Sequence, residues 1–94
     1  MIKEIIADIY FFSEKENGRK SDITNTSISY RPMLCYENNN YHCQIDFGEN
    51  ELIKLGHNYR LRIRVMDMCP IEQGAKFQLK ETRIIGTGEV INIL

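Results

Sequence analysis

The sequence predicts an all-β protein that folds as a small antiparallel β-barrel of six or seven strands. Apolar residues recur at every second position, as in residues 59–65 (YRLRIRV), where arginines alternate with Leu61, Ile63 and Val65. Turn-forming residues separate such runs, and no window has the i, i+3, i+4, i+7 spacing of an amphipathic helix. Short strands joined by turns indicate a sandwich or a barrel, and a barrel leaves no unpaired edges.

The predicted strands combine period-two alternation with β-forming residues; in chain order they are residues 5–13, 41–47, 59–65, 76–80 and 84–94. In residues 41–47, Cys43 and Ile45 face the same side as the aromatic residues at both ends of the run. In residues 76–80, Phe77 and Leu79 form the inward pair. The turn signals between the strands are Asn17-Gly18, residues 48–50, residues 56–58 and Gln73-Gly74. Residues 49–55 are the only stretch whose sequence is compatible with a brief helical turn.

Three consecutive asparagines lie between two β-like runs and predict the tip of a hairpin. Asparagine tolerates the positive φ that such a tip often needs. If the hairpin is symmetric about Asn39, Cys35 lies opposite Cys43 and Tyr36 lies opposite His42.

Length and composition predict one domain over residues 1–94, because 94 residues are enough for a single hydrophobic core. The net charge is −1, so any electrostatic function depends on local patches. Charged residues interrupt the apolar start, unlike a secretory signal, and no run approaches the roughly 20 apolar residues of a membrane span. The three cysteines form no Cys-x-x-Cys pair, which suits a reducing compartment. These features predict a cytoplasmic protein without membrane contact.

The cysteine and histidine residues are candidates for a metal site or a catalytic site. Cys35, His42, Cys43 and Cys69 do not have the spacing of ordinary zinc motifs. His42 and Cys43 are adjacent, so on a strand their side chains point to opposite faces. We therefore expect free cysteines packed as small hydrophobic residues, with no metal site and no Cys–His–Asp catalytic set.

Two groups of basic residues are candidate binding residues. Arg60, Arg62 and Arg64 share one face of a predicted strand, and Lys76 and Lys80 share a face of another. They form either a docking surface for phosphates or an acidic protein, or a solvated face neutralised by nearby acidic residues. The sequence leaves both interpretations open. Four tyrosines on the strands are expected to form barrel walls rather than platforms for bases, namely Tyr30, Tyr36, Tyr41 and Tyr59.

Several short motifs, in their order and spacing, resemble the C-terminal β-barrel (domain 3) of elongation factor Tu. They extend from about residue 4 to residue 94, and the matching residues are Ser13, Gly18 and Arg19; Tyr30, Arg31 and Pro32; Pro70, Ile71 and Gly74; and Gly86 and Gly88. The resemblance implies an antiparallel barrel of six or seven strands that performs no catalysis. A phosphate loop is absent, because Gly18-Arg19-Lys20-Ser21 lacks the preceding glycine, so no nucleotide or other cofactor is expected.

The resemblance also implies contacts with partners. In the family this barrel contacts the T-stem of aminoacyl-tRNA, the nucleotide domain and the exchange factor. Part of the tRNA contact lies in a loop that matches residues 80–84 here. Lys80, Glu81 and Arg83 fit the family pattern, but two glycines are missing and the loop is one residue shorter. Glycine permits a close approach of the backbone to phosphate, so this difference bears on tRNA binding.

The leading hypothesis is a non-catalytic, stand-alone binding module whose partner is a protein, either a toxin or a translation factor. One version is an immunity or antagonist protein against a bacterial toxin that acts on the translation machinery. The alternatives are a tRNA-binding accessory of translation and a remnant of a larger translation factor. The candidate binding residues are Arg31, Arg60, Arg62, Arg64, Lys76, Lys80, Glu81 and Arg83. Arg31 is expected to form a structural ion pair, and Gly86 and Gly88 to mark a bend or bulge.

Overall fold

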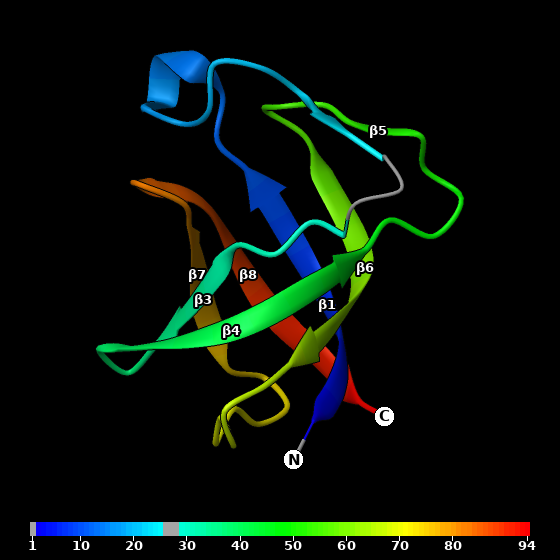
Figure 1. The fold of residues 1–94 in the computed structure, drawn as a ribbon, viewed down its shortest axis with the longest axis vertical. Coiled ribbons are helices and arrows are strands. Elements are labelled where there is room, and N and C mark those ends of the chain that lie inside the picture. Colours follow the sequence, from blue (N-terminus) through cyan, green and yellow to red (C-terminus); the bar gives the residue numbers. More distant parts are fainter. Residues whose placement is uncertain (1, 26–28) are drawn as a thin grey trace.

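The computed structural model describes residues 2–25 and 29–94 (Figure 1). Its elements are β1 (Lys3–Phe11), the 3-10 helix η1 (Glu14–Glu16), β2 (Ile23–Thr24), β3 (Met33–Tyr36), β4 (Asn39–Asp46), β5 (Leu52–Ile53), β6 (Asn58–Val65), β7 (Lys76–Lys80) and β8 (Ile84–Ile93). Six strands close into an antiparallel barrel in the order β1-β6-β4-β3-β7-β8, and β2 pairs with β5 in a separate two-stranded sheet. The predicted all-β barrel is confirmed. Within the described residues, no helix is long and apolar enough to cross a membrane.

The barrel core is built from the alternation seen in the sequence. In β1 every second residue from Ile5 to Phe11 is fully buried, and in β6 the buried residues are Leu61, Ile63 and Val65. Ile23 of β2 and Ile53 of β5 join the same buried cluster, so the small sheet packs against the barrel core. Burial of these side chains supplies the main driving force for folding. The outward residues of the strands are then free to form surfaces.

The two glycines of β8, Gly86 and Gly88, have different roles: one lies beside a bulge, and the other leaves space for a neighbouring side chain. The β7–β8 register shifts between Leu79 and Lys80, next to Gly86, so a bulge lies beside this glycine as predicted. Gly88 has no such shift. It lies opposite Phe77, and a Cβ at this position would lie 2.3 Å from the ring atom Cζ. Gly88 therefore makes room for the buried Phe77 ring.

The predicted register of the β3–β4 hairpin is wrong. Cys35 pairs with Asn40 and Tyr36 with Asn39, so the turn consists of only two residues, Glu37 and Asn38. Both have positive φ, 50° and 66°, as in the tight hairpin turns whose twist matches that of the strands. As a result, Cys35 points outward.

Residues 49–55, the stretch compatible with a brief helical turn, instead form a turn followed by β5. The predicted turns at Gly48, Gly56 and Gly74 are confirmed, and all three glycines have positive φ. The helix η1 was not predicted. Its N-cap is Ser13, which forms a capping box with Glu16, and its C-cap is Asn17 in the left-handed conformation.

Candidate binding surfaces

The arginine row on β6 (Arg60, Arg62 and Arg64) lies on the outer face of the barrel, as predicted. Three carboxylates of the neighbouring strands oppose its charge: Asp8 and Glu4 on β1, and Asp46, which lies opposite Arg62 on β4. Arg60 lies opposite Asp8 and Arg64 opposite Glu4. Arg60 donates two hydrogen bonds to the Asp8 carboxylate, at 2.7 and 3.1 Å. Glu4 accepts from Arg64 Nε at 3.1 Å and lies 3.8 Å from Arg62 Nη1.

The electrostatics of the row follow from these pairs. The hydrogen bond from Arg60 lowers the pKa of Asp8, and the same bond raises the pKa of Arg60. The arginine side chains remain more than half exposed, so each pair adds little stability. Because the pairs compensate the positive charge, a phosphate would have to compete with carboxylates already in place.

The β7–β8 loop is fixed by Glu81, which is engaged within the protein. The Glu81 carboxylate accepts a hydrogen bond from the Tyr30 hydroxyl and lies 3.4 Å from Arg19 Nε. The Arg19 guanidinium also lies over the Tyr30 ring, 5.7 Å from its centroid. Burial, followed by the bond to Glu81, raises the pKa of Tyr30. Glu81 therefore ties the loop to the start of the β3–β4 hairpin.

The prediction that Arg31 forms a structural ion pair is wrong. Arg31 is exposed, and no carboxylate of the described residues lies within 4 Å of its guanidinium. Successive residues of an extended chain point to opposite sides. Tyr30 therefore takes the inner position against Phe47 and Glu81, while Arg31 faces solvent. Lys80 is half-buried and Arg83 exposed, and within the described part of the chain neither forms an ion pair.

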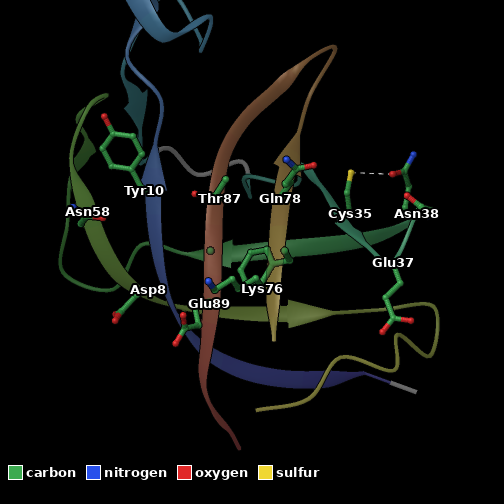
Figure 2. A pocket seen from close by; sticks show the side chains of 13 residues that line it. Asp8, Tyr10, Cys35, Glu37, Asn38, Asn58, Lys76, Gln78, Thr87 and Glu89 are labelled. Carbon is green, nitrogen blue, oxygen red and sulfur yellow. Dashed lines mark hydrogen bonds between the residues drawn. The ribbon is translucent and has the colours of Figure 1, made fainter. Parts of the chain in front are cut away.

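A hollow lies on the outside of the barrel over β1, β8, β7 and β3 (Figure 2). We call it the outer groove; its volume is about 810 Å³. One row of neutral polar residues follows the strand pairing across it and comprises Asn58, Tyr10, Thr87, Gln78, Cys35 and Asn40. The Cys35 thiol donates to Asn40 Oδ1 at 2.9 Å.

A second row in the outer groove is charged. Asp8 lies opposite Glu89, and Glu89 lies opposite Lys76 on its other side. Figure 2 shows the side chains of Glu89 and Lys76 near the middle of the groove and Glu37 at its far rim. Only Lys76 of these residues was proposed from the sequence. The acidic members come from β1, β8 and the hairpin turn, and only the barrel register brings them together.

Comparison with known protein families now identifies the relationship. The family model described as Elongation factor Tu C-terminal domain matches residues 1–94. The chain belongs to the elongation factor Tu C-terminal domain family. The resemblance inferred from the short motifs is thereby confirmed, and the closed barrel agrees with it. The elongation factor Tu C-terminal domain is a non-catalytic β-barrel.

A smaller hollow of about 330 Å³ lies on another face of the barrel. It is lined by Arg62 and Arg64 together with Glu4, and Gln44 donates to Ser29 Oγ at 3.0 Å at its edge. The two arginines are the ones already paired with Glu4. Its charges are therefore compensated in the same way as those of the arginine row.

Cys35, His42, Cys43 and Cys69 do not form a common metal or catalytic site in the described part of the chain. Cys43 is buried and donates to the Pro32 carbonyl at 3.1 Å, and burial raises its pKa to about 12. Its neighbour His42 faces solvent and lies 2.6 Å from Asp67. Cys69 is also buried in the core. In residues 2–25 and 29–94, no group of three or more potential metal ligands is present.

Proposed function

We propose that the chain is a non-catalytic binding module whose partner is a protein. The observation that carries this proposal is the chemistry of the outer groove, which is lined by amide and hydroxyl groups and by three carboxylates against one lysine. Amides and hydroxyls match the donors and acceptors of a polypeptide. A surface that binds phosphates needs an excess of cations, and neither the groove nor the compensated arginine row supplies one.

The specific form of the proposal is an antagonist of a toxin that acts on the translation machinery, in other words an immunity protein. Two features support it. The chain matches the family over residues 1–94 and closes into a six-stranded barrel. The loop at residues 80–84 differs from the family pattern, and Glu81 is engaged with Tyr30 and Arg19. A protein adapted to the family can bind the faces that a barrel of this kind presents.

A second candidate function is binding to the backbone of a tRNA arm. Arg31, Lys80 and Arg83 support it, because all three lie in the segments joined by Tyr30 and Glu81 and none forms an ion pair among the described residues. This function predicts steep salt dependence, with a slope of about 0.9 log units per phosphate neutralised on a duplex.

The experiment is affinity purification of the tagged protein from the cells that express it, with and without ribonuclease. The proposal predicts recovery of one protein in a stoichiometric amount, unchanged by ribonuclease. Recovery of tRNA, or of a complex that ribonuclease disperses, would support the RNA-binding alternative. A remnant without a present role would recover neither.

A further inference from the structure

The outer groove has the shape and chemistry of a site for a short extended peptide. We propose that it binds an extended segment of a protein partner that carries lysine or arginine side chains, an inference that rests on the proposed function. The neutral row from Tyr10 through Thr87 and Gln78 to Cys35 crosses three gaps between strands. At about 4.8 Å per gap this is on the order of 14 Å, the length of four or five extended residues.

The acidic residues that line the outer groove favour a partner segment with basic side chains. Asp8 and Glu89 lie directly opposite each other on β1 and β8, a placement of like charges that destabilises a sheet. Arg60 compensates Asp8. Glu89 has no ion pair within the described residues, and the ammonium of the opposite Lys76 lies beyond 4 Å from any described carboxylate. A guanidinium or ammonium from a partner would relieve the repulsion.

Glu37 supplies a second acidic group, at the rim of the groove. It occupies the first central position of the two-residue hairpin turn with a φ of 50°, where asparagine, aspartate or glycine is preferred. A glutamate in this conformation costs free energy. Such an outlier points to a function for the side chain. Glu37 is one of the residues that line the outer groove. Its carboxylate, whose hydrogen bond with the neighbouring Tyr36 hydroxyl raises the pKa of that tyrosine, forms no ion pair with the rest of the described chain.

The neutral row would hold the backbone of the occupant. Gln78 and Asn58 are exposed and each carries both donors and an acceptor on its side chain, and Thr87 adds a hydroxyl. These groups match peptide N–H and C=O groups, while the carboxylates would repel a phosphate backbone. The groove chemistry thus favours a basic polypeptide over a nucleic acid.

The test is a two-dimensional ¹⁵N–¹H NMR titration of the whole chain with the peptide Ac-RTRTRT-NH2, and with Ac-ETETET-NH2 as the matched acidic probe. The basic peptide should produce saturable shifts at the backbone amides of Glu37, Gln78, Thr87 and Glu89. The acidic peptide should produce none there. Equal shifts from both peptides, no saturable shift, or shifts confined to Glu4 on the arginine face would overturn the proposal. So would an RNA hairpin that shifts the same groove amides.

The variant E37Q/E89Q should bind the basic peptide with an affinity that is lower by about fivefold or more, since two exposed ion pairs between the peptide and the carboxylates are lost. E49Q is the matched control, because Glu49 is exposed in the turn after β4 and does not line the groove. Removing Glu89 also relieves its repulsion with Asp8, so E89Q should have a Tm equal to or above that of the wild type. Weaker binding without lower Tm excludes unfolding as the cause. An unchanged affinity would refute the role of these carboxylates.

Failure of this inference is distinguishable from failure of the proposed function. If E37Q/E89Q recovers the stoichiometric protein from cells as well as the wild type does, the groove assignment is wrong and the protein-binding function stands. If the wild type recovers no protein, the proposed function itself is wrong.

Discussion

Substitution of Gly88 by alanine should destabilise the barrel by overpacking its core. The added Cβ would lie 2.3 Å, 2.7 Å and 2.9 Å from Cζ, Cε2 and Cε1 of Phe77, whose side chain is only 4% exposed. Overpacking costs about 1–3 kcal/mol, and loss of the flexible glycine from the unfolded chain returns about 0.4–1 kcal/mol. The net loss is about 1–2 kcal/mol. Each kcal/mol should lower the Tm by about 4–8 °C in a domain of this size.

A double-mutant cycle in urea and thermal unfolding identifies the cause. In the F77L background the ring atoms that meet the new methyl group are gone, so G88A should cost less than about 0.5 kcal/mol there, a coupling of about 1 kcal/mol. G86A is the control: its Cβ would lie 2.6 Å from the carbonyl oxygen of Tyr10, which F77L leaves in place. Additive effects of G88A and F77L would refute the packing account of Gly88.

Three further changes test other parts of the structure. Because Arg60 lowers the pKa of Asp8 below its ordinary value of 3.8, the contribution of Asp8 to stability is present above about pH 4 and lost as pH falls through the lower folded value. In acid unfolding followed by circular dichroism, D8N should therefore vary less with pH below about pH 4 than the wild type, and an identical profile would count against the ion pair. Y30F removes the hydroxyl that donates a hydrogen bond to Glu81, and it should lower the free energy of unfolding in urea by about 0.5–1.5 kcal/mol. An unchanged free energy would mean that this bond does not stabilise the loop. M68G should raise the free energy of unfolding by about 0.5–1 kcal/mol, because Met68 is 77% exposed and its φ of 56° is strained for a residue other than glycine. A free energy of unfolding below that of the wild type would contradict this strain.

The barrel itself was predictable from the sequence because its cause is local. Alternation in residues such as Leu61, Ile63 and Val65 decides which face of a strand is buried, wherever the strand pairs. The glycine turns at Gly48 and Gly74 were predictable for the same reason, since glycine has no Cβ and tolerates positive φ wherever it lies in the fold.

The hairpin register and the candidate surfaces depend on interactions beyond the local pattern. Three asparagines suggested a turn centred on Asn39, but the turn formed at Glu37 and Asn38, where the side-chain preference is weaker. Tyr30 and Glu81 are 51 residues apart, and only barrel closure joins them. The neutralising partners of the arginines and the acidic floor of the outer groove likewise depend on which strands pair.

The central claim is that this barrel works by binding a protein, and native mass spectrometry of the complex recovered from cells tests it most directly. The account predicts a single added mass that matches one polypeptide and that persists after ribonuclease treatment. An added mass that corresponds to RNA and disappears with ribonuclease, or a chain recovered at its own mass alone, would contradict it.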